Sequence, residues 1–184
     1  TRVACMGKRQ SLRDLQSRLA EKLEAAKSGA AGTAASWLAV DANGSKFLFP
    51  LSQSGEIYPL TLTHHVAHTK DWFIGVANLR GALFGIADFD GFLRNAKPAP
   101  RPVQTLSDVR FVTLNASIEM NCALQVDKLE GLRSVTSFKK SEPPETSSPA
   151  FYGHVYTDLN DAKWQEINLQ ILAQQGEFLN INKQ

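Results

Sequence analysis

The sequence predicts a mainly β protein made of two small barrels, with an amphipathic helix before them and a short helix after them. Three observations support this fold class. Short apolar segments bounded by Gly, Pro, Asn or Asp recur over residues 37–170. An Asn-Gly pair at 43–44 separates two of these segments, as in a tight hairpin. Several glycines inside the segments favour the sharply bent strands of a closed barrel over an open sheet.

Composition is that of a folded protein without an obvious charged or membrane partner. The chain has 184 residues, of which 43% are hydrophobic and 21% charged. A net charge of +2 gives no electrostatic footprint for nucleic acid or a membrane surface. Cys5 and Cys122 are too few for a disulfide framework or a zinc site. No apolar run has the length of a membrane span or a signal peptide core, so a cytoplasmic protein is expected.

Residues 11–27 predict an amphipathic helix. Its apolar positions recur at steps of three and four: Leu12, Leu15, Leu19, Leu23 and Ala26. Ser11 can serve as the N-cap, and Gly29 can end the helix because glycine adopts a left-handed conformation cheaply. Such a narrow stripe must pack on something, either this chain's own domain or a partner. An Ala- and Gly-rich connection follows, so residues 1–36 are assigned to the helix and a linker.

Residues 37–95 predict the first barrel, with a short helix at its end. Its five expected strands are Trp37–Val40, Lys46–Phe49, Glu56–Tyr58, Trp72–Ala77 and Ala82–Ala87. The helix is expected to begin at Phe89, before three prolines at 98, 100 and 102 break the chain.

Residues 104–170 predict the second barrel. Its expected strands are Val109–Leu114, Cys122–Val126, Leu132–Thr136, Phe151–Tyr156 and Trp164–Leu169. Residues 141–149 (SEPPETSSP) have the composition of a mobile loop. The later part of residues 165–178 has a helical pattern, so the whole domain is assigned to residues 37–182.

The sequence contains no assembled set of residues for catalytic or metal chemistry. His64, His65 and His68 lie close together, but no Glu or Cys stands at a ligand spacing and the HExxH pattern is absent. Hydrolase, phosphate-loop and dinucleotide motifs are also missing. Asp88 and Asp90 are more typical of a helix cap or an arginine pair than of an acid–base dyad. We therefore expect no enzyme, no cofactor and no metal; the alternative is a small-ligand, metal-binding or enzymatic barrel that uses the 64–68 loop.

Asn78-Leu79-Arg80-Gly81 interrupts the long apolar run from Trp72 to Asp88. One interpretation is structural: Gly81 takes the turn, Asn78 bonds locally, and Arg80 pairs with Asp88 or Glu56, because an arginine beside a core needs a carboxylate. The other is functional: Arg80 borders a groove that receives a partner. The residues alone leave both open.

These residues resemble a known family. GVANLRG at 75–81, followed by an apolar strand that ends in Ala87-Asp88-Phe89, resembles the signature of CheW-like coupling proteins of bacterial chemosensory arrays. Residues 49–51, 56–57 and 123–132 resemble further family segments. Phe89-Asp90 and Gly85 depart from the usual residues of the signature. The stretch 72–81, together with the leucine-rich N-terminal helix, is most similar to the PilI-type branch, which serves type IV pili and twitching motility.

The resemblance implies two five-stranded, SH3-like barrels packed around a common core, and a scaffold without enzymatic activity. It implies two partners, the cytoplasmic hairpin of a methyl-accepting chemoreceptor and the regulatory domain of a CheA-like histidine kinase, with no nucleic acid and no membrane insertion. The expected location is cytoplasmic, at receptor arrays on the inner face of the membrane. A flagellar chemotaxis coupling protein is the alternative within the family. The partner-binding or signature positions implied are Val76, Asn78, Leu79, Arg80, Gly81, Asp88 and Phe89.

Overall fold

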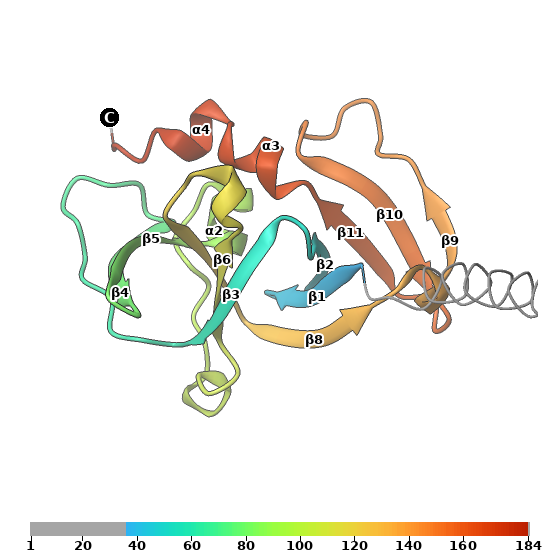
Figure 1. Ribbon diagram of the computed structural model, residues 1–184, viewed down its shortest axis with the longest axis horizontal. Helices are drawn as coiled ribbons and strands as arrows, with labels where there is room; N and C mark the ends of the chain where they lie inside the picture. The colour runs from blue at the N-terminus through green and yellow to red at the C-terminus, as the bar shows by residue number, and fades with distance from the viewer. Residues whose placement is uncertain (1–35, 184) are drawn as a thin grey trace, which may run out of the picture.

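The computed structural model describes residues 36–183 as two β-sheets with short helices between and after them (Figure 1). The helix predicted at 11–27 lies outside these residues. The first part of the chain contains β1 (Trp37–Ala42), β2 (Ser45–Pro50), β3 (Ser54–Pro59), β4 (Phe73–Leu79), β5 (Ala82–Asp88) and α2 (Phe89–Arg94). The middle contains η1 (Val103–Thr105), β6 (Arg110–Leu114), η2 (Ala116–Ile118), β7 (Cys122–Val126) and β8 (Lys128–Arg133). The last part contains η3 (Val135–Ser137), β9 (Phe138–Glu142), β10 (Tyr152–Asp158), β11 (Lys163–Ile167), α3 (Leu169–Ala173) and α4 (Gly176–Leu179).

The larger sheet has the strand order β8-β1-β2-β11-β10-β9, and the smaller sheet has the order β3-β6-β7-β5-β4. Neighbouring strands are antiparallel except in the pairs β2–β11 and β5–β7, which are parallel. Figure 1 shows the smaller sheet on the left and the larger sheet on the right. The predicted fold class, mainly β with two sheets and few helices, is confirmed.

The predicted division of the strands between the barrels is wrong. Residues 37–95 and 104–170 do not form successive barrels, because β1 and β2 pair with β8 and β11 in the larger sheet while β3 to β7 form the smaller one. The chain therefore leaves the larger sheet after β2 and returns to it after β7. Hydrophobic patterns locate strands, but they do not say which strand pairs with which.

The larger sheet has six strands because β9 joins it as an edge strand. The first residues of the predicted loop 141–149 belong to this strand, so the loop begins only after Glu142. Lys139, Lys140 and Ser141 are exposed, which removes the apolar alternation of a half-buried strand. Lysine-rich edges are a common protection against unwanted strand pairing.

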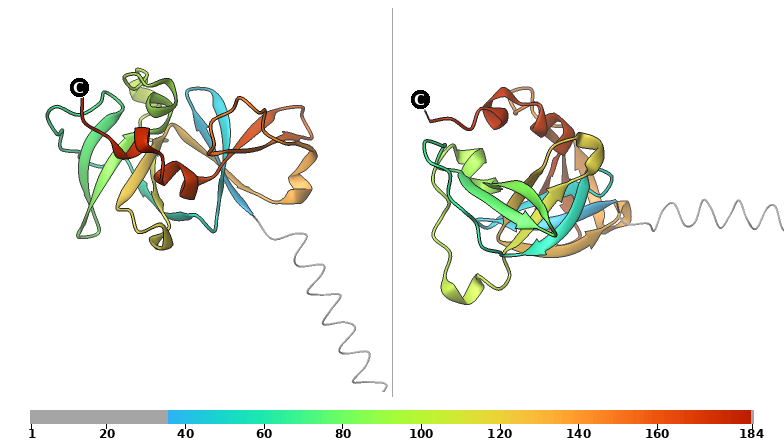
Figure 2. Two further views of the ribbon diagram at one scale, coloured as in Figure 1. Left: turned by 90° about the horizontal axis from the view of Figure 1, so that it is seen from above. Right: turned by 60° about the vertical axis from the view of Figure 1, so that its left-hand side comes forward.

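Each barrel has its own interior, and a third apolar cluster joins the barrels. Inside the smaller barrel lie Ala77, Leu79, Ile86, Phe111 and Ala123, and inside the larger lie Trp37, Ala39, Leu48 and Trp164. The shared core contains residues of both sheets and of the helices α2, α3 and α4. Within it, Phe89 of α2 packs edge-on against Phe47 and Phe49 of β2, with ring centroids 5.0 and 5.1 Å apart. Figure 2 shows α3 and α4 crossing the junction of the two barrels.

Among residues 36–183, no helix is long and apolar enough to cross a membrane.

Candidate partner-binding surface

The β4–β5 hairpin carries the central signature residues. Leu79 and Ala82 pair directly, so Arg80 and Gly81 form a two-residue loop. Both have positive φ, 51° and 87°, which is the requirement of a type I′ hairpin turn. The Gly81 N–H donates to Asn78 Oδ1 over 2.8 Å. The predicted roles of Gly81 in the turn and of Asn78 in a local bond are confirmed.

Glu56, not Asp88, is the carboxylate partner of Arg80. Arg80 Nη1 lies 2.7 Å from Glu56 Oε2, and the Tyr58 hydroxyl donates to the same oxygen over 2.9 Å. The guanidinium carbon also lies 5.6 Å from the centroid of the Tyr58 ring. Since β3 and β4 are opposite edges of the smaller sheet, a contact between β3 and the tip of the β4–β5 hairpin joins its two edges. The pair therefore helps to close the barrel.

This ion pair lies in solvent and is not a buried charge. The Arg80 and Glu56 side chains are 75% and 57% exposed, and exposed pairs of this kind contribute about 0–1 kcal/mol. The hydrogen bond to Glu56 raises the pKa of the Tyr58 phenol above its ordinary value.

Two large apolar residues near this ion pair in the sequence are exposed: Ile57, which follows Glu56, and Leu83, which follows the hairpin loop. We refer to Glu56, Ile57, Arg80 and Leu83 as the β3–hairpin surface.

The remaining signature residues divide by burial. Asn78 and Gly81 are exposed and Val76 is half-buried, whereas Leu79, Asp88 and Phe89 are buried. In this conformation the three buried residues cannot contact a partner directly. Leu79 fills the smaller barrel and Phe89 the shared core.

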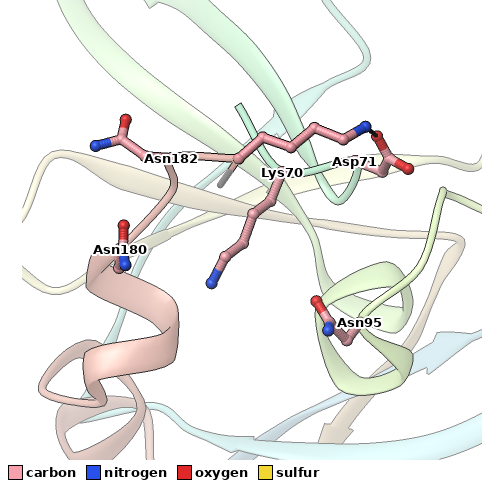
Figure 3. Close-up of a pocket in the computed structure, with 6 residues that line it drawn as sticks. Lys70, Asp71, Asn95, Asn180 and Asn182 are labelled. Carbon is pink, nitrogen blue, oxygen red and sulfur yellow. Dashed lines mark hydrogen bonds and ion pairs between the residues drawn. The ribbon is translucent and has the colours of Figure 1, made fainter. Parts of the chain in front are cut away.

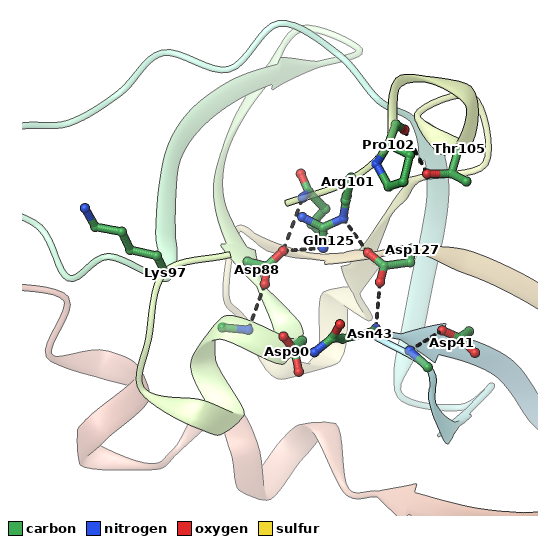
Figure 4. Close-up of polar contacts among 12 residues, drawn as sticks. Asp41, Asn43, Asp88, Asp90, Lys97, Arg101, Pro102, Thr105, Gln125 and Asp127 are labelled. Atoms are coloured by element: carbon green, nitrogen blue, oxygen red, sulfur yellow. Dashed lines mark hydrogen bonds and ion pairs between the residues drawn. The ribbon is translucent and has the colours of Figure 1, made fainter. Parts of the chain in front are cut away.

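Asp88 is the centre of a buried polar cluster at the junction of the barrels (Figure 4). Its Oδ1 accepts from the Gly91 N–H over 2.7 Å, which caps α2. Its Oδ2 pairs with Arg101 Nη2 over 2.5 Å and also accepts from Gln125 Nε2 over 3.2 Å. The Nε of Arg101 pairs with Asp127.

The second carboxylate of this cluster reaches the other barrel. Asp127 lies between β7 and β8, where the chain returns to the larger sheet, and its Oδ2 accepts from the Asn43 N–H of the β1–β2 turn over 2.6 Å. All four carboxylate oxygens thus accept a hydrogen bond, which is the condition for a buried ionic network to be tolerated. Burial lowers the pKa of the Arg101 guanidinium, but the attraction of Asp88 and Asp127 outweighs it and leaves that pKa raised.

Sequence reasoning missed Arg101. Its only signal is the flanking pattern Pro100-Arg101-Pro102, since proline fixes its own φ and keeps the preceding residue extended. A preordered linker of this kind holds the guanidinium between the two carboxylates at a low entropic cost.

The histidine segment serves the fold through its backbone. The His64 N–H donates to the Val76 carbonyl over 2.7 Å, and the Val76 N–H donates to the His64 carbonyl over 2.9 Å. A Cβ at Gly75 would lie 2.1 Å from the His64 carbonyl oxygen, so only glycine permits this approach. Within residues 36–183, no three His, Cys, Asp or Glu side chains gather as metal ligands would.

A polar pocket of about 400 Å³ lies between the loop before β4, the end of α2 and the C-terminal segment (Figure 3). Its lining residues are Lys70, Asp71, Asn95, Asn180, Asn182 and Lys183. Both lysines have partners: Lys70 Nζ donates to the Glu177 carbonyl over 3.2 Å, and Lys183 Nζ pairs with Asp71 over 2.8 Å. These contacts tie the C-terminal segment to the smaller barrel.

The described residues thus form two barrels around a shared core, with an exposed ion pair and a tight turn on the smaller barrel. A family model described as the CheW-like domain matches residues 36–164, and the chain belongs to this family. Protein PilI of Pseudomonas aeruginosa is 28% identical over 141 residues, which cover 75% of each chain. The crystal structure of the scaffolding protein TtCheW from Thermoanaerobacter tengcongensis has the same fold, with a TM-score of 0.60 at 15% identity over 78% of this chain and 94% of that one.

Proposed function

We propose that this protein is a non-enzymatic scaffold that couples chemoreceptors to a histidine kinase in a bacterial chemosensory pathway. The observation that carries the proposal is the CheW-like family match, which extends over both barrels from residue 36 to 164. The similarity to Protein PilI, together with the wording of residues 72–81, supports the pathway of type IV pili and twitching motility. Such a protein acts in the cytoplasm, at receptor arrays on the inner face of the membrane.

The β3–hairpin surface is the proposed contact region. Its ion pair and tight turn are preformed, so binding there requires little ordering of the scaffold. Ile57 and Leu83, which lie close in sequence to Glu56 and Arg80, are exposed and supply apolar area, and an apolar contact with a polar rim is the usual composition of an interface. A scaffold of this kind couples its partners only when its contacts differ between the states of the receptor or kinase.

Binding of a purified chemoreceptor hairpin and of a kinase regulatory domain, measured by calorimetry, tests this function. Arg80→Ala is expected to weaken binding of at least one partner while the melting temperature stays nearly unchanged, because the exposed pair contributes little stability. Lys139→Ala is the matched control, since Lys139 pairs with Asp161 over 2.5 Å on the larger barrel and is also exposed. Normal binding by the Arg80 variant together with a lowered melting temperature would make Arg80 a structural residue only.

The pathway is tested by deleting the gene and scoring both twitching and swimming. Loss of twitching with normal swimming is expected. The opposite pattern would support the flagellar alternative. If the purified protein binds neither partner, and shows a metal-dependent activity that His64→Ala removes, the scaffold function is wrong.

A further inference from the structure

Three large apolar side chains are exposed at one end of the larger barrel. Leu132 of β8, Val135 of η3 and Leu159 of the β10–β11 turn are 58%, 61% and 70% exposed. They come from three elements, and we refer to them together as the terminal apolar patch. Scattered apolar residues on a surface need no explanation, but a group of them at one place often marks an interaction site.

The elements that carry these side chains lie close to the point where the chain enters β1. The Ser36 N–H donates to the Arg133 carbonyl over 2.8 Å, between Leu132 and Val135 in the sequence. The Trp37 and Phe138 rings are in contact, with centroids 5.9 Å apart, and Phe138 pairs with Asp158, the neighbour of Leu159. Figure 1 shows the start of β1, the end of β8 and the β10–β11 turn at the same end of the larger barrel.

We propose that residues 11–27 bind the terminal apolar patch of their own chain as an amphipathic helix. Their leucines at 12, 15, 19 and 23 recur on one face of a helical pattern, and the charged residues fall on the other side. The CheW-like domain begins at residue 36, so this segment is an addition to the family domain and joins it beside the patch.

The covalent connection to the barrel favours residues 11–27 over a separate molecule as the segment that binds the terminal apolar patch. The nine residues 28–36 separate the leucine-rich segment from the patch. A flexible chain of that length spans about 15–18 Å, and a short flexible tether gives an effective concentration in the mM range. A modest apolar contact is therefore enough to keep the segment on the patch.

Thiol labelling of the full chain tests this contact. A reporter is introduced beside the patch as Thr136→Cys, with Cys5→Ser in the same chain; Cys122 is buried and does not compete. Leu19→Asp places a charge on the leucine stripe. Ser17→Asp is the matched control, because it adds the same charge on the opposite side of the helical pattern. A second reporter, Lys140→Cys in place of Thr136→Cys, is a control on β9, where residue 140 is exposed. Its labelling rate should be the same in the Leu19→Asp and Ser17→Asp chains.

Leu19→Asp is expected to raise the labelling rate at the Thr136→Cys reporter about tenfold, whereas Ser17→Asp leaves it unchanged, and dilution of the protein has no effect. Equal rates in the Leu19→Asp and Ser17→Asp chains would overturn the proposal. Protection that disappears on dilution would also overturn it, because a second copy of the chain would then occupy the patch. The readout is independent of receptor and kinase binding.

Discussion

Phe89→Ala separates a structural role of a signature residue from a direct contact with a partner. Phe89 is fully buried in the shared core, edge-on to two phenylalanines of β2. Truncation of a buried phenylalanine typically costs about 3–5 kcal/mol. Each aromatic pair accounts for about 0.5–1.5 kcal/mol beyond the buried area. Because domains have a total stability of only about 5–15 kcal/mol, we expect the variant to lose roughly a fifth or more of its unfolding free energy.

Urea unfolding followed by tryptophan fluorescence measures this loss, with the slope of the transition showing whether it remains two-state. Leu83→Ala is the control, since Leu83 is exposed and its truncation should change stability by no more than about 0.5 kcal/mol. Partner binding is then measured well below the unfolding midpoint of each variant. A Phe89→Ala chain that loses less than about 1 kcal/mol, yet no longer binds a partner, would refute the structural reasoning.

Three further predictions concern single positions. Burial raises the pKa of the Cys122 thiol to about 12, from an ordinary value of 9.0. In a Cys5→Ser chain the Cys122 thiol should resist alkylation while the protein is folded. The contribution of the neutral thiol to the free energy of unfolding should be lost as pH rises from 9 towards 12, and a Cys122→Ala chain should not show this loss. Gly75→Ala should cost about 1–3 kcal/mol in urea unfolding, because φ is 142° and the new Cβ would meet the His64 carbonyl; an unchanged midpoint would contradict this close approach. A hydrogen bond from the indole N–H of Trp164 lowers the pKa of Asp158 below its ordinary value of 3.8. Its contribution to stability is therefore present above that pH and lost below it, so Asp158→Asn should flatten the acid side of the stability curve, and an unaltered acid side would argue against the bond.

The sequence contains enough information for the class of fold and for most strands, because these depend on local patterns. The Asn43-Gly44 turn, for example, requires positive φ at both residues, and both have it. Pairing between strands was not predictable, since it depends on contacts between segments far apart in the chain. β2 pairs with β11 over only two residues, Phe47 with Gln165 and Leu48 with Glu166. No periodicity within either strand encodes that contact.

The candidate site was predictable at the level of residue types but not of partners. The sequence indicated that Arg80 needs a carboxylate, and it left Glu56 and Asp88 open. The closure of the smaller barrel decides between them, because it brings β3 beside the hairpin tip. Arg101 was missed because its two carboxylates come from positions 13 and 26 residues away in the chain.

The family signature combines residues with two different physical roles. Asn78, Arg80 and Gly81 shape an exposed turn, whereas Asp88 and Phe89 hold the junction of the barrels from inside. If the chain acts as the proposed scaffold, a substitution in either group would weaken coupling, and only the exposed group would do so without loosening the domain. Because the turn geometry and the ion pair constrain the signature itself, discrimination between related partners must come from exposed neighbours that the fold does not constrain. On the β3–hairpin surface those neighbours are Ile57 and Leu83. Exchanging these two side chains for those of a related coupling protein should therefore change partner preference while the midpoint of urea unfolding stays the same. A changed midpoint with an unchanged preference would show that other residues determine which partner is bound.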